Sequence, residues 1–363
     1  MAAEQMSAVA AQVCGVKFWN QRWLSVLIAE KFGAAPVFHD SFDLALAASR
    51  ERAAPLILWA SSLSEEQRAQ ARQLDCYFLE DGFIRSVGLG AGLNAGLSYV
   101  FDRRGIYYNA ARASDLEHLL QHMELTPAQL QRGERLRQLL VANEISKYNL
   151  KKSTTFTLGP DSRRRILVVG QVQNDASITT NPAPQLATMA GDNINLSLIR
   201  WCRQENPEAC IVYKPHPDVA ADLRPGKIDT GSLAGLVDGV VVERDILALI
   251  DWCDELHTIS SLAGFEALIR GKAVVTHGGP FYAGWGLTRD FDSFPRRNRP
   301  LSLAALVYIL LVEYGHYVDP VGARQCSPEV LIEHLAQRKG SRYAHLKASV
   351  LTGISWAARK VGL

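Results

Sequence analysis

Short apolar runs alternate with amphipathic stretches in the N-terminal part of the chain. The runs at 35–39, 54–60 and 75–81 have the length of buried strands, and the stretches at 41–51 and 64–74 space their apolar residues as helices do. Alternating strands and helices form parallel α/β sheets. We therefore expect an α/β unit here, followed over 114–150 by a helical bridge that breaks near Thr126 and Pro127.

A second strand and helix series follows the bridge. The longest apolar run, at 301–318, predicts one buried helix, because Glu313 and Gly315 interrupt it well before the roughly 20 residues that span a bilayer. Segments 327–340 and 346–362 are expected to form closing helices. The expected strands of this series lie at 163–172, 210–217, 240–244, 255–260 and 272–278, and its expected helices at 193–206, 245–253 and 262–271.

The two series predict an α/β fold of two Rossmann-like domains facing a central cleft. A chain of 363 residues exceeds the roughly 250–300 residues at which a single core stops growing. We assign residues 1–155 to an N-terminal domain with its helical bridge and residues 160–325 to a C-terminal domain. Residues 326–363 are assigned to closing helices that either cross back to the N-terminal domain or lie toward a membrane. Open α/β sheets bind ligands at the carboxyl ends of their strands, so the loops after the strands are expected to line the cleft.

Composition narrows the partners and the compartment. The 39 basic and 37 acidic residues give a net charge of only +2, so no chain-wide field favours nucleic acid. The six cysteines form no CxxC pair, which is typical of buried thiols in a reducing compartment rather than of disulfides or a zinc knuckle. No basic stretch precedes the mild apolar N-terminus, so we expect no signal peptide and a cytoplasmic protein.

Cationic and hydroxyl side chains follow two of the expected strands. Lys214 precedes Pro215, and His216 lies between Pro215 and Pro217. The two prolines end a strand and stiffen the loop that presents both side chains. Ser260 and Ser261 precede a helix, where a hydroxyl and free amides bind anions or cap the helix. These residues predict a site for an anionic ligand, and the alternative is an ordinary loop lysine, a half-buried histidine and a helix cap.

Carboxylates follow two other strands. Asp175 in GQVQNDAS is a candidate nucleophile, base or metal ligand, or caps the following turn. Glu80 and Asp81 end a strand in EDGFIRS together with Arg85, where paired carboxylates divide acid and base roles or form a surface salt bridge. Glu266, on the helix after Ser261, is placed to accept hydrogen bonds from sugar hydroxyls or else lies in solvent.

A loop with aromatic residues among glycines follows the last expected strand. In GPFYAGWGLT, residues such as Gly284 let the backbone bend close to a ligand, while Phe281, Tyr282 and Trp285 supply rigid apolar walls. The alternative is that these aromatic side chains are simply buried in the apolar core. We expect Tyr282 and Gly284 on the ligand side of the cleft.

Five sequence blocks together resemble a known family. In order along residues 50–340, the blocks are EDGFIRSVGLG, GQVQNDASI, YKPHP, SSLAGFEALIRGKAVVTHGGPFYAGWGLT and YVDP…CSPEVLIEHL. They are similar to the bacterial capsule polysaccharide biosynthesis family of β-Kdo transferases, of the KpsC type. The resemblance implies a GT-B glycosyltransferase that transfers 3-deoxy-D-manno-oct-2-ulosonic acid (Kdo) from CMP-Kdo, with retention of β configuration. The acceptor it implies is a Kdo-terminated glycolipid on phosphatidylglycerol, in the linker of capsule chains.

The resemblance also implies roles for single residues. Asp175 would be the nucleophile of a double displacement, Glu80 or Asp81 the acid/base, and Arg85 an acceptor contact. His277, in VVTHGGPF, departs from the variable or aromatic residue expected there. The donor-binding residues implied are Gln171, Lys214, His216, Ser260, Ser261, Glu266, Tyr282 and Gly284.

The resemblance implies no cofactor beyond the donor substrate and no catalytic metal. Full-length members are similar to two such modules in tandem, and this chain matches one, so a second transferase module is an expected partner. The basic, apolar tail at 346–362 predicts either peripheral contact with the inner membrane or packing across the domains. Two other functions stay open: a noncatalytic glycolipid-binding or scaffolding module, and a GT-B enzyme for another CMP-activated sugar acid such as sialic acid.

Overall fold

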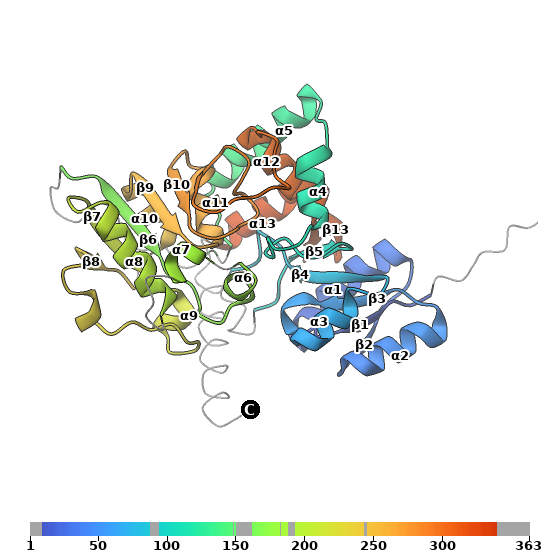
Figure 1. The fold of residues 1–363 in the computed structure, drawn as a ribbon. Helices are drawn as coiled ribbons and strands as arrows, with labels where there is room; N and C mark the ends of the chain where they lie inside the picture. The colour runs from blue at the N-terminus through green and yellow to red at the C-terminus, as the bar shows by residue number, and fades with distance from the viewer. Residues whose placement is uncertain are drawn as a thin grey trace, which may run out of the picture.

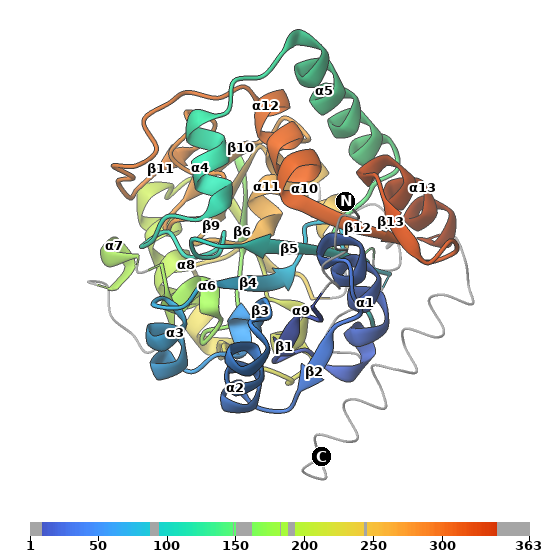
Figure 2. The ribbon, with the colours of Figure 1, turned by 90° about the vertical axis from the view of Figure 1, so that its right-hand side faces the viewer.

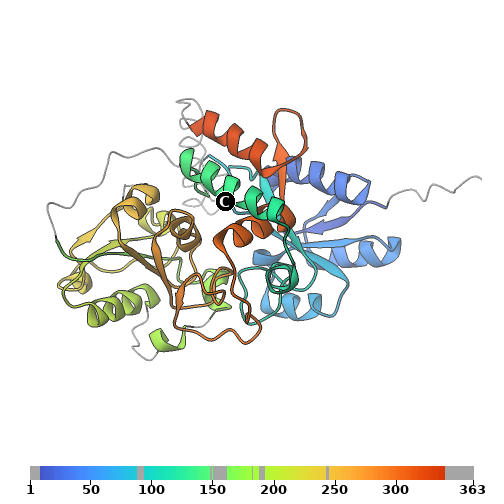
Figure 3. The same ribbon diagram turned by 90° about the horizontal axis from the view of Figure 1, so that it is seen from above.

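The computed structural model describes residues 9–87, 94–147, 149, 162–181, 183–187, 193–242 and 245–339. Two β-sheets, each covered by helices, form two lobes that lie side by side (Figures 1 and 3). The expected helix at 346–362 falls outside the described residues. Within the described ranges, no helix combines the length and the apolar character needed to cross a membrane.

The first sheet is mixed rather than parallel throughout. Its seven strands run in the order β13-β12-β5-β4-β3-β1-β2, of which β2, β1, β3 and β4 are parallel and β5, β12 and β13 pair antiparallel (Figure 2). The strands are β1 (Gln12–Cys14), β2 (Val37–His39), β3 (Leu56–Trp59), β4 (Cys76–Asp81), β5 (Ser98–Asp102), β12 (Gly315–Asp319) and β13 (Arg324–Cys326).

Capping residues set the ends of the helices in this unit. Ser41 caps α2 (Phe42–Arg52), and Ser64 with Gln67 forms a capping box on α3 (Glu65–Ala71). The unit also contains α1 (Phe18–Phe32) and α13 (Pro328–Lys339). The predicted helices at 41–51 and 64–74 are therefore confirmed, although α3 ends three residues earlier than predicted.

The bridge between the sheets consists of α4 (Asp115–His122) and α5 (Pro127–Ala142). Thr126 and Gln129 form a capping box, and Pro127 occupies the first turn of α5, which explains the predicted break. Helix α5 packs against α12 (Leu303–Tyr308), in the middle of the molecule (Figure 1).

The second sheet is entirely parallel. Its order β8-β7-β6-β9-β10-β11 is that of a doubly wound sheet, with the switch point between β6 and β9. The strands are β6 (Arg165–Val169), β7 (Cys210–Lys214), β8 (Gly239–Val240), β9 (Glu255–Thr258), β10 (Ala273–Thr276) and β11 (Arg289–Asp290). The helices are α6 (Ala176–Thr179), α7 (Pro184–Ala187), α8 (Ile194–Glu205), α9 (Pro217–Ala220), α10 (Ile246–Trp252) and α11 (Leu262–Leu268).

The apolar run at 301–318 is not the single helix that we predict. Helix α12 continues as a π-helical turn over Ile309–Tyr314 and ends at Gly315, where the backbone becomes extended. Residues 315–319 then form β12, which pairs antiparallel with β5. The chain therefore rejoins the first sheet before residue 326, the start that we assign to the closing segment.

An aromatic cluster joins the two sheets. Phe281, which follows β10, lies 5.0 Å from Phe83 and 5.9 Å from Tyr107, measured between ring centroids. Phe83 and Tyr107 belong to the first unit, and their own centroids are 4.8 Å apart. Burial of these rings places the carboxyl ends of strands from both sheets around one space.

Candidate functional site

A cavity of about 400 Å³ lies between the two units at the carboxyl ends of their strands. The carboxyl end of β4 and the loops after β3, β6, β7, β9 and β10 all contribute to its wall, as the rule for open α/β sheets predicts. The lining residues are Ser61, Arg68, Glu80, Tyr107, Tyr108, Lys147, Gln171, Val172, Asn174, Asp175, Ala176, Ser177, Thr179, His216, Arg224, Ser260, Ser261, Leu262, Pro280 and Phe281.

Gln171 occupies the switch point. Its Oε1 accepts hydrogen bonds from the amide of Ser260 at 2.8 Å and from the hydroxyl of Thr258 at 3.2 Å, while its Nε2 donates to Ser260 Oγ at 3.1 Å. The side chain therefore ties the loop after β6 to the loop after β9. Both loops are fixed in place before any ligand binds.

Asp175 caps the short helix α6 and also faces the cavity. Its Oδ1 accepts from the amide of Ser177 at 2.9 Å and from the Ser177 hydroxyl at 2.8 Å. The two expectations for this residue, cap and cavity carboxylate, are thus compatible. Since both bonds use Oδ1, the carboxylate is oriented by one oxygen and retains the other, Oδ2, for a ligand.

His216 lines the cavity and Lys214 does not. The Nδ1 of His216 accepts from the amide of Asp218 at 3.1 Å, so the neutral ring carries its proton on Nε2. Burial lowers the pKa of His216, which keeps this neutral donor form at pH 7. The Nζ of Lys214 is buried and donates to the carbonyl of Val242 at 3.1 Å, and burial lowers its pKa to about 8.

In the block that begins with Ser260, the two serines line the cavity and Glu266 does not. Ser260 and Ser261 line the cavity, but Ser260 Oγ donates to the carbonyl of Ser177 and Ser261 Oγ caps α11. Glu266 is buried below them and accepts from the amide of Lys147 at 2.9 Å. Burial raises the pKa of Glu266 to about 7. Its side chain therefore positions the segment that carries Lys147 and does not reach the cavity.

Of the two carboxylates at the carboxyl end of β4, Glu80 lines the cavity and Asp81 does not. Glu80 lines the cavity; its Oε2 accepts from the amide of Ser61 at 3.1 Å and its Oε1 from that of Asp81 at 3.2 Å. Burial, with the charge of Asp81 adding to it, raises the pKa of Glu80 to about 7. A carboxyl group with this pKa exchanges protons readily at neutral pH.

Asp81 and Arg85 lie away from the cavity. The buried Arg85 and the half-buried Asp81 form an ion pair of 2.7 Å, and Arg85 also donates to the carbonyl of Asn94 at 2.8 Å. Arg85 therefore does not line this cavity, and its guanidinium holds the loop that leads into β5. The expected acceptor contact stays a prediction.

The aromatic and glycine loop contributes two wall residues. Pro280 and Phe281 line the cavity, whereas Tyr282 and Trp285 are fully buried. The hydroxyl of Tyr282 donates to the carbonyl of Ser261 and approaches Gly264 so closely that a Cβ there would lie 2.1 Å from it. Gly284 adopts φ +83° and its amide donates to Asp290 at 2.7 Å. Tyr282 and Gly284 therefore shape the loop from behind and do not face the ligand side that we expect for them.

Several cavity residues were not predicted from the sequence. Arg68, Lys147 and Arg224 bring positive charge to the wall, and Tyr107 and Tyr108 add phenol groups. Lys147 follows α5 and Arg68 lies on α3, so neither follows a strand directly. Arg224 comes after the short helix α9, and the signal available in the sequence was only its nearness to the YKPHP block.

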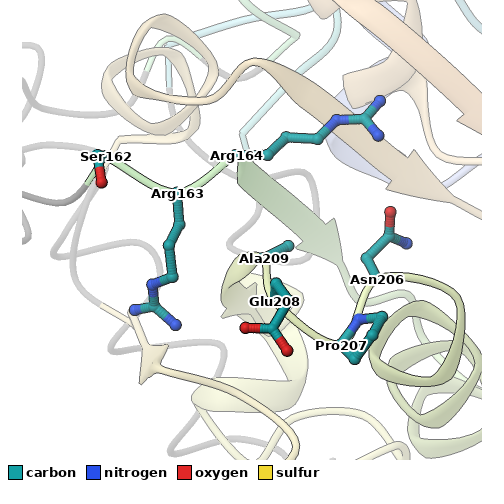
Figure 4. Close-up of a pocket in the computed structure, with 7 residues that line it drawn as sticks. All are labelled: Ser162, Arg163, Arg164, Asn206, Pro207, Glu208 and Ala209. Carbon is teal, nitrogen blue, oxygen red and sulfur yellow. The ribbon is translucent and has the colours of Figure 1, made fainter.

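A second pocket, of about 350 Å³, lies at the opposite end of the parallel sheet (Figure 4). Residues just before β6 and β7 line it, and the guanidinium groups of Arg163 and Arg164 point in different directions. Arg163 pairs with Asp238 at 2.8 Å and Arg164 with Glu255 at 2.7 Å. Its place at the amino ends of the strands and its paired arginines make it the weaker candidate. Its lining residues are Ser162, Arg163, Arg164, Asn206, Pro207, Glu208 and Ala209.

Sequence relatives identify the family. The family model described as capsule polysaccharide biosynthesis protein matches residues 56–158 and 140–315. The chain is 41% identical over 287 residues to the capsule polysaccharide modification protein LipA of Neisseria meningitidis, and 40% identical over 259 residues to the lipopolysaccharide-processing protein LpsZ of Rhizobium meliloti. The alignments cover 79% and 70% of this chain, but 40% and 56% of those proteins. The chain thus spans about half the length of these relatives.

Solved structures agree with the sequence relatives. The β-Kdo 2,7 transferase of Thermosulfurimonas dismutans KpsC superposes with a TM-score of 0.72 at 33% identity, and the β-Kdo 2,4 transferase of the same protein with 0.75 at 30% identity. Each match covers 90% of this chain and 98% of the other. The mixed α/β fold with its parallel sheets is therefore similar to that of KpsC. The chain belongs to the capsule polysaccharide biosynthesis protein family, and within it to the KpsC type.

Proposed function

We propose that this chain is a GT-B type glycosyltransferase that moves Kdo from CMP-Kdo to a Kdo-terminated glycolipid, with retention of configuration. The observation that supports the proposal best is the pair of carboxyl groups on opposite walls of one cavity. Asp175 comes from the second unit and Glu80 from the first, and the protein holds them in different ways. The KpsC neighbours, which bear the names of Kdo transferases, support the choice of sugar.

In the first step, Asp175 is the nucleophile. A carboxylate oxygen attacks the anomeric carbon of the donor, a bond forms between them, and the bond to the phosphate oxygen of CMP breaks. CMP leaves with the electron pair, so this step needs no proton donor. The neutral His216 presents Nε2–H to the cavity, where it is placed to donate to the anionic donor.

In the second step, Glu80 is the general base. The acceptor hydroxyl attacks the anomeric carbon from the face that CMP has left, its proton passes to Glu80, and the bond to Asp175 breaks. Two inversions give net retention. The pKa of about 7 suits Glu80 to accept this proton near neutral pH. Of the two carboxylates expected as acid/base, we therefore assign the role to Glu80 and not to Asp81.

The charge of the cavity wall fits a sugar acid. Kdo carries a carboxylate and CMP a phosphate, and Arg68, Lys147 and Arg224 line the same cavity. The steps above need only these side chains and no metal ion. The remaining donor-binding assignments act indirectly in this proposal: Lys214, Glu266, Tyr282 and Gly284 support the loops that carry Gln171, Ser260 and Ser261.

The cellular setting is part of the same proposal. We infer a cytoplasmic protein that works at the inner face of the membrane, where a phosphatidylglycerol-based acceptor would lie. Because the alignment covers 40% of LipA, we expect a second transferase module as a partner in this setting. Binding to vesicles that contain phosphatidylglycerol, measured by flotation, tests the membrane contact.

The central experiment is to trap the covalent intermediate. The protein is mixed with CMP-Kdo without acceptor, quenched, digested and analysed by mass spectrometry. The expected result is one Kdo on the peptide that contains Asp175, and this adduct disappears when a Kdo-terminated acceptor is added. CMP release without any adduct would refute the double displacement. A preference for CMP-sialate would refute the choice of sugar, and tight glycolipid binding without nucleotide binding would indicate a scaffold.

A further inference from the structure

A second group of reactive side chains lies behind the parallel sheet. Cys202 of α8, His257 of β9 and His277 after β10 are all completely buried. Each offers one ligand atom, and these atoms lie within 4.8 Å of one another. The group faces away from the cavity, because the neighbouring Thr258 points to Gln171 while His257 points toward α8.

The spacing of the two imidazoles fits a shared cation. His257 Nδ1 and His277 Nε2 are 3.2 Å apart. Two imidazole nitrogens on one tetrahedral zinc ion are separated by about 3.3 Å, and a thiolate sulfur lies about 3.6 Å from each. The three ligand atoms lie at most 4.8 Å apart, so the sulfur and the nitrogens would have to approach one another by at most about 1.2 Å to bind one ion.

A carboxylate orients the first of these rings. Glu255 Oε1 lies 2.7 Å from His257 Nε2, so His257 donates that proton and directs the lone pair of Nδ1 toward His277. Glu255 is itself fixed by Arg164 at 2.7 Å. A carboxylate behind a histidine is the arrangement that metal sites use to set the tautomer of a ligand.

Hydrogen bonding alone leaves the histidine pair unsatisfied. If His277 donates from Nε2 to His257, its Nδ1 becomes a buried acceptor, and this atom has no hydrogen-bond partner among the described residues. If His277 carries its proton on Nδ1, two lone pairs face each other across 3.2 Å. A cation between the rings turns this second arrangement from repulsive into favourable.

We propose that Cys202, His257 and His277 bind a structural zinc ion. A thiolate and two imidazoles form a ligand set that suits zinc and not magnesium or calcium. The ion would link α8 to β9 and β10, the strands whose loops carry Ser260 and Phe281. Its role is to stabilise the second unit, and it takes no part in the transfer steps.

The test begins with the metal content of the native protein. The full chain is purified without a metal-affinity tag, stripped with a chelator and given zinc alone. We expect about one equivalent of zinc by mass spectrometry, and a lower thermal midpoint after stripping that zinc restores. Cobalt in place of zinc should give the thiolate-to-metal charge-transfer absorption that marks cysteine as a ligand.

Two variants decide whether this cluster is the site. His277→Phe removes a ligand but keeps a ring that can stack on Phe291, from which the imidazole centroid is 4.9 Å away. Cys202→Ala removes the thiol, and Cys210→Ala, at another buried cysteine, is its matched control. We expect the first two variants to lose the zinc and the control to keep it.

Either of two results would overturn the proposal. One is a wild-type chain that takes up no zinc after reconstitution. The other is a folded His277→Phe or Cys202→Ala variant that retains a full equivalent of zinc. For Cys202→Ala, persistence of the cobalt charge-transfer absorption counts as the same result. Folding of each variant is followed by circular dichroism, so a loss of metal through unfolding is recognised. Turnover of CMP-Kdo is not the readout, so failure of the proposed function leaves the result interpretable.

Discussion

The two walls of the cavity hold their carboxyl groups in opposite ways. On the wall from the second unit, one oxygen of Asp175 accepts an amide and a hydroxyl, and the loop around it is tied to Gln171 and Ser260. On the wall from the first unit, Glu80 accepts from the backbone amides of Ser61 and Asp81, and burial raises its pKa to about 7. One environment fixes the orientation of a carboxylate and the other raises the pKa of a carboxyl group, so the division of roles that we propose follows from the surroundings rather than from residue type.

Removing the charge of Asp175 should have the largest effect. Asp175→Asn keeps the size of the side chain and an acceptor oxygen for Ser177, but it cannot attack the donor. We expect kcat to fall by about 10³-fold or more, without loss of fold. The matched control is Asp222→Asn, at an exposed aspartate paired with Lys227. Full turnover by Asp175→Asn would show that this wall does not supply the nucleophile.

Glu80→Gln tests the opposite wall. As a base, Glu80 acts in its ionised form, so the kcat of the wild type should rise as the pH increases through about 7 and level off above it. In Glu80→Gln we expect kcat to fall by about 10²-fold or more and this rise to disappear. The comparison variant is Asp81→Asn, assayed well below its melting temperature. If Asp81→Asn abolishes the rise and Glu80→Gln does not, the assignment of the base is reversed.

His216→Ala should weaken binding of the donor nucleotide without changing the roles of Asp175 and Glu80. Loss of one hydrogen bond to a charged group costs about 1.5–3 kcal/mol, so the Kd for CMP should increase by about 10- to 100-fold. Calorimetric titration measures this directly, with His118→Ala, at an exposed histidine, as control. Unchanged CMP affinity would place the nucleotide elsewhere on the wall.

Glu266→Gln tests whether a raised pKa caused by burial affects stability without affecting turnover. Glu266 has a raised pKa like that of Glu80 but does not line the cavity. Its pKa rises from 4.5 in the ordinary state to about 7 in the folded protein, so the folded state holds the proton that the unfolded state has lost. Stability is therefore expected to decrease as the pH rises from 4.5 to about 7.

In Glu266→Gln this loss should be absent, and the free energy of unfolding at pH 8 should exceed that of the wild type by about 1–2 kcal/mol. Urea titrations at pH 5 and pH 8 measure the difference. The pH dependence of kcat should persist in this variant. Equal stability of the two proteins at pH 8 would mean that folding does not raise the pKa of Glu266.

Strand ends and helix caps are local features, and the sequence predicts them well. The capped helices at 41–51 and 64–74 are confirmed, as are the strands at 163–172 and 210–217 in their central residues. Asp175, His216 and Ser260 follow strands of one parallel sheet, so their meeting at one edge could be predicted. Their functional roles stay predictions.

Long-range pairing is what the sequence does not reveal. β5 and β12 are short and antiparallel, and their partners lie far away in the chain, so no local pattern marks them. Lys147 and Arg68 reach the cavity through the packing of helices and not through a strand end. Cys202, His257 and His277 are likewise too far apart in sequence to form a recognisable ligand spacing.

The return of the chain to its first sheet has a consequence for synthesis on the ribosome. Strand β5 pairs with β12, so the edge of the first sheet stays open until residues 315–319 have emerged. By then every strand of the second sheet is already outside the exit tunnel, and that sheet can form before the N-terminal one is complete. The unit made first is thus finished last, and an N-terminal fragment that ends before Gly315 would carry an unpaired edge prone to aggregation.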